Sequence, residues 1–453
     1  MACGDCENLG KRVEQLERRL AEAAANLAAT NSKLEEALRA GKRQANPFAK
    51  DQKKPKDKHK KPGRQPGHPD SSRKSPENVD AVVDVPLRGC PSCGGDVGQQ
   101  KEHEHFVLDL PDLSAIWTKF VTRSGHCESC GVWCSSKHPL LPSIAVGAAA
   151  TSIGHNLKAF IAQLRTQTGA SLGKIADFLT QWFKLPLSRS GILFILKRLS
   201  EQLKPCRDEI RGTLRSSASA HMDETGWRVL GESSWLWVAT NQNATLFHID
   251  KSRGHEVALE MLGTEFKGVL HSDFLRTYDA LPGITKSKCV AHLLKHIRDL
   301  SKIQTPAIHA FPTAVKSIFQ AALELRKGQA DLADPGYLQK AARLEDKLDK
   351  LLIRRRRNDH NRRLRNRLIR HRSDVLRFLR DPHAVATNNL AERQIRPGVL
   401  FRKVSGGHRS VDGPEAYSIL QSVYATCVQQ KKRFGRFVAE TLAGMGPSLF
   451  VSS

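Results

Sequence analysis

The chain has 453 residues, which is enough for two or three domains with sizeable hydrophobic cores. It carries 72 Lys and Arg against 46 Asp and Glu, a formal net charge of +26. This excess favours a polyanionic partner, with nucleic acid first among them. The sequence lacks both a run of about 18 apolar residues and the apolar core of a signal peptide. Composition therefore argues against a membrane protein, and we expect a soluble, intracellular one.

Residues 7–40 predict a coiled coil. Apolar residues recur every three or four positions there, with Glu, Arg and Lys between them. One apolar seam consists of Val13, Leu20, Leu27 and Leu34. A coiled coil of about four heptads would let copies of the chain associate, so we expect a homo-oligomer. A single amphipathic helix packed on its own chain is the alternative.

Residues 41–76 predict a basic disordered linker. The segment is rich in Lys, Pro and Gly and is nearly devoid of large apolar side chains. It cannot bury enough apolar surface to fold by itself. Its lysines either lie along nucleic-acid phosphates or remain solvated without a defined contact.

Two Cys-x-x-Cys pairs within residues 77–138 predict a zinc ribbon. In such a domain, four thiolates on two knuckles hold a tetrahedral Zn²⁺, and here a strand-rich interval separates the pairs. In a reducing compartment this spacing favours metal over a disulfide, and a redox role is the weaker alternative because neither pair has a βαβ context. The expected ligands are Cys90, Cys93, Cys127 and Cys130.

Residues 139–210 predict three helices, the third of them capped by Ser188. The breaks between the helices give a helix-turn-helix-like pattern, in which the third helix would enter a DNA major groove. A helical packing unit that makes no base contacts is the alternative.

Residues 211–430 predict an α/β domain. Three strand-like runs are followed by a helix and by a further strand that should pair with the first. That pairing would bring Asp223 and Asp273 side by side. A third acid, Glu392, lies in a segment with the spacing of a helix packed against a sheet. Glu224, next to Asp223, would point to the opposite face.

Asp223, Asp273 and Glu392 are the candidate catalytic and metal-binding residues. Hard divalent cations prefer oxygen ligands, so three converging carboxylates suit two Mg²⁺ or Mn²⁺ ions per active site. Two such ions, about 3.5–4 Å apart, would activate water or a DNA 3′-hydroxyl and stabilise the leaving oxygen in phosphoryl transfer. In isolation each acid would more often be a cap or a surface residue, but their joint placement favours catalysis.

The interval from about 300 to 380 predicts an all-helical insertion in this domain. Its arginine run would present arginines on more than one face of a helix and favours contact with the DNA backbone over a solvated helix. The candidate DNA-binding residues there are Arg354, Arg355, Arg356 and Arg357.

A second basic group follows Glu392. It would bind scissile phosphates or merely solvate a helix end, and the glycines of SGGHRS would allow the backbone to approach a phosphate. Its candidate DNA-binding members are Arg393, Arg396, Arg402, Lys403 and Arg409. We expect a closing helix and then a basic tail over residues 431–453.

Several sequence blocks resemble those of transposases of the insertion-sequence 66 family, in the same order along most of the chain. They are DETGW, HSDFLRTYDAL, CVAHLLKHIRDL and NNLAERQIRPGVLFRKVSGGHRS. The resemblance implies a ribonuclease-H-like core with a DDE triad, and thus a multidomain α/β protein. It also implies a structural or second-shell role for Cys289 and His292, whose alternatives are half a zinc site or a buried Cys beside a packed His.

The same resemblance implies a DNA transposase that binds the terminal inverted repeats of its element and transfers strands to target DNA. The enzyme would be bacterial, cytoplasmic and nucleoid-associated, and a role for accessory proteins of the element stays open. One alternative is a non-catalytic zinc-ribbon regulator, which predicts a damaged triad. Another is a ribonuclease-H-fold nuclease, which would not need the coiled coil, the ribbon or the basic insertion.

Overall fold

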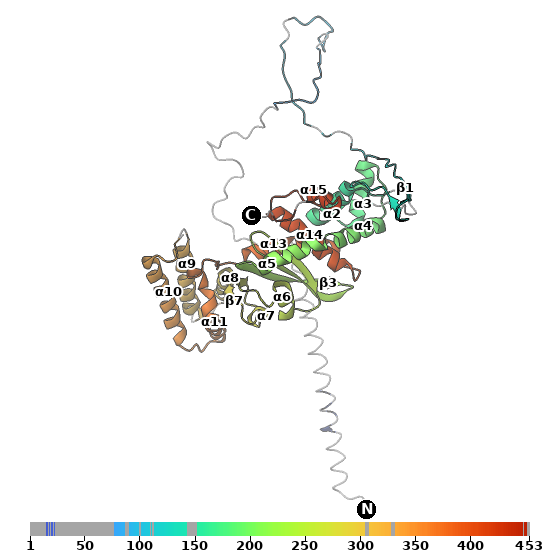
Figure 1. Cartoon of the computed structure of the whole chain (residues 1–453). Helices are drawn as coiled ribbons and strands as arrows, with labels where there is room; N and C mark the ends of the chain where they lie inside the picture. Colours follow the sequence, from blue (N-terminus) through green and yellow to red (C-terminus); the bar gives the residue numbers. More distant parts are fainter. Residues whose placement is uncertain are drawn as a thin grey trace, which may run out of the picture. The chain divides into compact units, whose positions relative to one another are not determined.

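The structure is a computed structural model that describes most of the chain from residue 77 onward (Figure 1). The described residues are Gln15, Leu16, Arg18, Leu20 and Glu22, then 77–86, 90–98, 101–108, 110, 113–142, 152–303, 308–327, 331–446 and 448–450. The early positions are helical, but the rest of the predicted coiled coil (7–40) and the whole predicted linker (41–76) lie outside the described residues. The chain divides into two compact units, Met1–Leu108 and Asp109–Ser453.

A five-stranded mixed sheet forms the centre of the second unit. In spatial order its strands are β5 (Thr245–Asp250), β4 (Glu232–Thr240), β3 (Ser219–Val229), β6 (Val269–Ser272) and β7 (Thr285–Lys288). The strands β3, β4 and β5 are antiparallel, whereas β6 and β7 run parallel to β3. The predicted pairing of the fourth strand with the first is confirmed by the β3–β6 ladder. Parallel neighbours need a crossover, and α6 (His255–Leu262) lies within it.

Helix α14 (Gly413–Gln429) lies along β5, the outer strand on one side of the sheet. The Ser422 hydroxyl accepts a hydrogen bond from the Phe247 N–H at 2.8 Å, and the Thr426 hydroxyl accepts one from the Thr245 N–H at 3.1 Å. An uncovered edge strand presents such N–H groups to other chains. The α14 hydroxyls therefore satisfy an edge that would otherwise promote aggregation.

In the described stretch from residue 152 onward, four helices precede the sheet. They are α2 (His155–Thr168), α3 (Leu172–Phe183), α4 (Arg189–Gln202) and α5 (Lys204–Arg215). Ser188 caps α4 as predicted, because its hydroxyl accepts a hydrogen bond from the Gly191 N–H at 3.0 Å. Helix α5 runs across position 210, where the sequence suggested the boundary between the helical region and the α/β domain.

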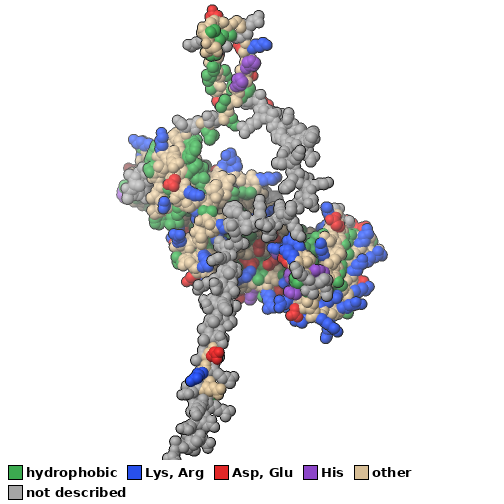
Figure 2. Space-filling model, turned by 180° about the vertical axis from the view of Figure 1, so that it is seen from behind, with side chains coloured by type: hydrophobic (Ala, Val, Ile, Leu, Met, Phe, Trp, Pro, Cys, Tyr) green, Lys and Arg blue, Asp and Glu red, His purple; other side chains and the backbone are tan. Residues whose placement is uncertain are grey.

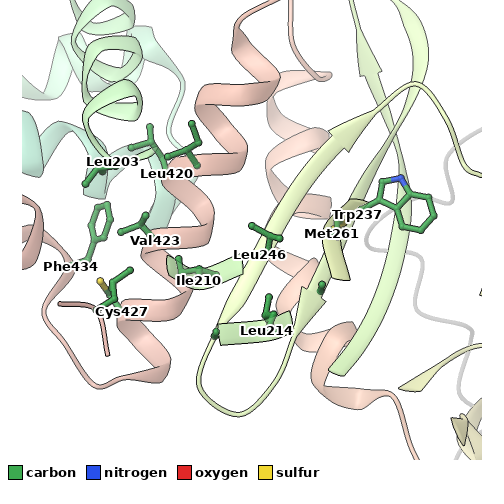
Figure 3. Close-up of a cluster of buried hydrophobic side chains, with 14 of the residues drawn as sticks. Leu203, Ile210, Leu214, Trp237, Leu246, Met261, Leu420, Val423, Cys427 and Phe434 are labelled. Atoms are coloured by element: carbon green, nitrogen blue, oxygen red, sulfur yellow. The ribbon is translucent and has the colours of Figure 1, made fainter. Parts of the chain in front are cut away.

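One hydrophobic core joins these helices to the sheet (Figure 3). Its members come from all four of these helices, from β3 to β6, and from α6, α14 and the carboxyl-terminal helix. They include Leu203, Ile210, Leu214, Trp237, Leu246, Met261, Leu420, Val423, Cys427 and Phe434. The carboxyl-terminal helix is α15 (Phe434–Leu442), within the segment where the sequence predicted a basic tail. Its apolar residues recur at helical spacing, so Phe434, Phe437 and Val438 are buried despite the basic composition around them.

The predicted helical insertion shares a second hydrophobic cluster with Val269 of β6 and with the helix that precedes it. It follows α8 (Val290–Leu300) and consists of α9 (Ala310–Arg326), α10 (Pro335–Ile353), α11 (Asp359–Arg370), α12 (Arg372–Val375) and the short 3₁₀ helix η2 (Arg377–Leu379). Figure 1 shows these helices gathered at the β7 end of the sheet.

The arginine run differs from its prediction. Arg354–Arg357 do not extend a helix, since α10 ends at Ile353 and α11 begins at Asp359. Asn358 caps the new helix by accepting the His360 N–H at 2.9 Å. The cap at Asn358 supplies a competing helix start.

Within the described part of residues 101–123, the β-like runs form no strand. The strands found nearby are the short β1 (Ser124–His126) and β2 (Trp133–Ser135), which flank the second Cys pair. Val107 is 87% exposed and Trp117 is 77% exposed. Apolar alternation specifies a strand only where a second layer covers one face, and here the side chains remain uncovered.

Candidate active site

Asp223 lies in β3 on the face that carries helix α13 (Asn389–Ser405). Its cross-strand partner Val238 belongs to the hydrophobic cluster that contains Ala391 and Ile395 of α13. Glu224 pairs with Trp237, which belongs to the core on the other face. The predicted opposition of Asp223 and Glu224 is therefore confirmed.

The Glu224 carboxylate is hydrogen-bonded to side chains on its own face of the sheet. The Tyr278 hydroxyl donates a hydrogen bond to Glu224 Oε2 at 2.6 Å, and Arg253 donates two to Oε1 at 2.8 and 3.2 Å. The Glu224 side chain is only 2% exposed. Its carboxylate is therefore a buried structural group rather than a ligand for substrate.

Asp273 follows β6 directly and lies in register with Asp223. The parallel ladder pairs His221 with His271, and each histidine precedes its aspartate by two residues. The two strands therefore reach Asp223 and Asp273 at the same level of the sheet. Asp273 Oδ1 accepts the Leu275 N–H at 2.8 Å, which fixes the turn after the strand.

Glu392 lies in the first turn of α13. Burial, and then the neighbouring carboxylates of Glu224, Asp273 and Glu392, together raise the pKa of Asp223 to about 7 against a hydrogen bond from the Glu224 N–H. Asp273 and Glu392 therefore lie near enough to Asp223 to act on its carboxylate. Their mutual repulsion is what a bound divalent cation would relieve, and their oxygen donors suit Mg²⁺ or Mn²⁺.

Cys289 and His292 adjoin the same site. Cys289 is the N-cap residue of α8, and His292 lies in the first turn of that helix. His292 Nδ1 is 3.6 Å from Glu392 Oε1. The neighbouring Cys289 side chain, and then the Glu392 and Asp273 carboxylates, raise the pKa of His292 to about 9 against the effect of burial. Within the described residues, the potential ligand atoms of Cys289, His292 and Glu392 lie within 4.8 Å of one another, and neither aspartate belongs to that set.

A buried polar network fixes the start of α13, and sequence reasoning missed it. Asn388 is completely buried; its side-chain amide donates to Met222 O at 2.7 Å, and its Oδ1 accepts from His221 Nδ1 at 3.1 Å. The backbone N–H of Asn388 donates to Cys289 Sγ at 3.2 Å. Asn388 thus ties β3 and the start of α8 to α13, one turn before Glu392.

His271 completes this network. Its ring stacks on His221 with 4.2 Å between centroids, its Nδ1 donates to Ala220 O at 3.2 Å, and its Nε2 accepts the Val385 N–H at 2.9 Å. Burial lowers the pKa of His271 to about 4 and that of His221 to about 3, so both rings are neutral near pH 7. The available signal was a repeated His-x-Asp spacing, at Asp223 and at Asp273.

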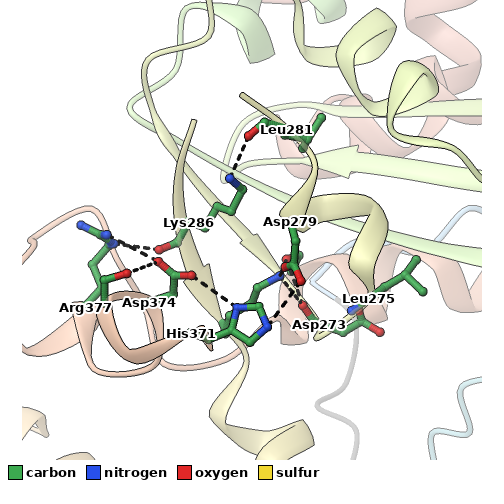
Figure 4. Close-up of polar contacts among 11 residues, drawn as sticks. Asp273, Leu275, Asp279, Leu281, Lys286, His371, Asp374 and Arg377 are labelled. Atoms are coloured by element: carbon green, nitrogen blue, oxygen red, sulfur yellow. Dashed lines mark hydrogen bonds and ion pairs between the residues drawn. The ribbon is translucent and has the colours of Figure 1, made fainter. Parts of the chain in front are cut away.

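A chain of polar contacts connects the Asp273 turn to the helical insertion (Figure 4). Lys288, whose side chain is 0% exposed, lies 2.9 Å from Asp279 Oδ1 and donates to the Asp273 carbonyl oxygen at 3.0 Å. On the other side of Asp279 lies His371 at 3.4 Å, and beyond it Asp374 at 3.5 Å. The insertion therefore helps to hold the turn that carries Asp273.

Most of the predicted DNA-binding cations are exposed, and two are engaged elsewhere. Figure 2 shows Lys and Arg side chains gathered over the lobe formed by the insertion. The exposed predicted residues are Arg354, Arg355, Arg357, Arg393, Arg396, Lys403 and Arg409. Arg356 instead lies over the Phe311 ring and donates to Leu351 O at 3.0 Å. Arg402 donates to Gly226 O and to Thr225 Oγ1, which attaches the end of α13 to β3.

One of the SGGHRS glycines packs its backbone against β3. Gly407 has φ +112°, and a Cβ there would lie 2.2 Å from the Arg228 carbonyl oxygen. His408 donates its backbone N–H to that oxygen at 2.9 Å. The close backbone approach is therefore made to β3.

The two Cys-x-x-Cys pairs have the same turn geometry. The Gly94 N–H donates to Cys90 O, and the Gly131 N–H donates to Cys127 O, both at 2.8 Å. Backbone N–H groups within each turn lower the pKa of Cys90 and of Cys127, which favours thiolates. Each pair lies in a different compact unit.

A family model described as "Transposase IS66 family" matches residues 150–416, which include the whole sheet and all three acids. The chain belongs to the IS66 transposase family. Membership makes the protein a nucleic-acid-processing enzyme with DNA as its partner, and the expected family is thereby confirmed. A search of curated proteins finds no match to this transposase. None of its described helices is long and apolar enough to span a membrane.

Proposed function

We propose that this transposase cuts and joins the ends of its own element, using Asp223, Asp273 and Glu392 on a ribonuclease-H-like core. The observation that carries the proposal is the β3–β6 register, which brings two aspartates to one level of the sheet with α13 above them. The strand order β5-β4-β3-β6-β7, with only β6 and β7 parallel to β3, supports the choice of core.

The three acids would hold two divalent cations, Mg²⁺ or Mn²⁺. When bound, such ions supply the charge that activates an attacking hydroxyl and stabilises a leaving oxygen. The protein's own part is to hold the carboxylates together against their repulsion. Asn388 and the two histidines position α13 over β3, and Lys288 holds the Asp273 turn.

The substrate we propose is double-stranded DNA that carries the element's terminal inverted repeats, followed by target DNA. The exposed arginines of the α10–α11 turn, on the insertion, and of α13, beside Glu392, are the residues we propose to contact the DNA phosphate backbone. Helices α2 to α4 are the candidate base-reading unit. We infer that the enzyme works as a homo-oligomer in the bacterial nucleoid, and accessory proteins of the element would be further partners.

We also propose that Cys90, Cys93, Cys127 and Cys130 hold a structural Zn²⁺. The matched turns, each with backbone N–H groups directed at a thiol, support this ligand set. The redox alternative predicts disulfides, so zinc content of the reduced full chain separates the two.

The decisive experiment incubates the full chain with Mg²⁺ and a plasmid carrying the gene together with its flanking DNA. The conservative variants Asp223→Asn, Asp273→Asn and Glu392→Gln should each lose cleavage and joining while retaining a DNA mobility shift. Glu232→Gln, at an exposed position in β4, is the matched control and should retain activity. Cleavage by any of the three site variants would contradict that residue's assignment. Cleavage without joining in the native chain would favour a nuclease, and binding without cleavage would favour a regulator.

A further inference from the structure

Cys289, His292 and Glu392 form a cluster of which the proposed three-acid site uses only Glu392. Cys289 and His292 are three positions apart at the start of α8, a spacing that places both side chains on one side of the helix. Glu392 reaches the cluster from α13. A thiol, an imidazole and a carboxylate thus converge from two helices, with their ligand atoms within 4.8 Å of one another.

His292 Nδ1 has the environment of an unused ligand atom. It is shielded from solvent and has no hydrogen-bond partner among the described residues. Its 3.6 Å separation from Glu392 Oε1 is too long for a hydrogen bond. In a tetrahedral zinc site the nitrogen and oxygen ligands are about 3.3 Å apart, so only a small adjustment is needed.

The surroundings of Cys289 also suit a metal thiolate. The thiol is buried, and its Sγ accepts the Asn388 backbone N–H at 3.2 Å, a contact that would orient a sulfur ligand. The side chains of His292 and Glu392 remain 37% and 32% exposed, so one side of the cluster is open to solvent. That opening provides both an entry path and a fourth position for water.

We propose that Cys289, His292 and Glu392 bind a soft divalent cation, with Zn²⁺ as the best fit. A thiolate and an imidazole select zinc over Mg²⁺, which prefers oxygen ligands. Binding forms bonds to Sγ, Nδ1 and one Glu392 oxygen, and the thiol and imidazolium protons leave to water. This site is separate from the four-cysteine site proposed above.

Because the cluster shares Glu392 with the three acids, zinc and the catalytic cation compete for one carboxylate. Zinc should therefore inhibit DNA cleavage, a consequence that rests on the proposed function. The zinc site itself does not rest on it, since metal content is measured without DNA.

The first test compares zinc bound per chain after loading the full-length protein with ZnCl₂ and removing free metal by desalting. The native chain should retain one zinc ion more than His292→Gln and one more than Cys289→Ser. Cys206→Ser, a half-buried cysteine in α5 outside the cluster, is the matched control and should retain the native content. Circular dichroism confirms folding, and His292→Gln alone suffices if Cys289→Ser does not fold. Equal zinc content in the native chain and His292→Gln overturns the proposal.

The second test titrates ZnCl₂ into the cleavage assay at fixed Mg²⁺, with each protein normalised to its own zinc-free rate. The zinc concentration for half inhibition should rise by about tenfold or more in His292→Gln. If zinc content follows the prediction but no chain cleaves DNA, the metal site stands and the proposed function fails. If cleavage is seen but zinc inhibits both chains at the same concentration, competition for Glu392 is refuted.

Discussion

Asn388→Ala is the sharpest test of how the proposed active site is assembled. The substitution removes the amide that bonds Met222 O and the oxygen that bonds His221 Nδ1, in a position with no solvent access. Each buried partner left unsatisfied costs about 1–3 kcal/mol. We therefore expect the free energy of unfolding to fall by about 3 kcal/mol and the apparent melting temperature by about 6 °C or more.

The effect on function should exceed the effect on stability. Asn388 immediately precedes α13, so its loss frees the helix start that positions Glu392. We expect cleavage at a temperature where the variant is fully folded to fall by about tenfold or more, because small displacements of catalytic groups are costly. Thermal melting by circular dichroism and the plasmid assay measure the two effects. Asn243→Ala, at an exposed position in the β4–β5 turn, is the control and should change stability by less than about 0.5 kcal/mol. A variant with native melting temperature and native cleavage would refute the anchoring role of Asn388.

Three further predictions follow from burial and charge. The pKa of Asp223 is raised in the folded protein, so the stability that its protonated form contributes is lost as pH rises from about 4 through about 7. The melting temperature of the metal-free chain should therefore fall over this range. The Asp223→Asn substitution should reduce that fall. In α13, Gly398→Ala would place a Cβ 2.4 Å from a leucine methyl of β4 and should lower the free energy of unfolding by about 1–3 kcal/mol. The control Gly212→Ala lies in open space on α5 and should raise that free energy by up to about 1 kcal/mol. Equal shifts in melting temperature would contradict the packing at Gly398. Lys288→Met leaves the Asp279 carboxylate without its buried lysine partner and should lower the free energy of unfolding by about 3–5 kcal/mol. Adding Asp279→Leu should recover much of that loss. No recovery in denaturant unfolding would show that the pair is not coupled.

Local patterns in the sequence determined much of the fold. The apolar runs of β3 to β6, the cap at Ser188 and the helical spacing of the insertion were sufficient to predict elements that the structure contains. The opposite directions of Asp223 and Glu224 also followed, since adjacent side chains on a strand alternate between faces. These features depend on neighbours within a few positions, and the sequence displays such relations directly.

Where local preference conflicted with packing, the sequence misled. The four arginines at 354–357 are compatible with a helix in isolation, but a competing cap at Asn358 and contacts made by Arg356 end α10 before them. The contact of Gly407 with the Arg228 carbonyl of β3 also depends on a segment remote in the chain, so the sequence did not display it.

The sequence by itself determined which residues are candidates for chemistry, because the types and spacings of acids, cysteines and arginines can be read from it directly. Only the tertiary structure decided which of them are available. It buried Glu224 against Tyr278 and Arg253, tied Arg402 to β3, and joined Cys289 and His292 to Glu392. The physical reason is that a polar side chain takes its role from partners that satisfy or oppose its charge, and for these residues the partners come from strands and helices remote in the chain.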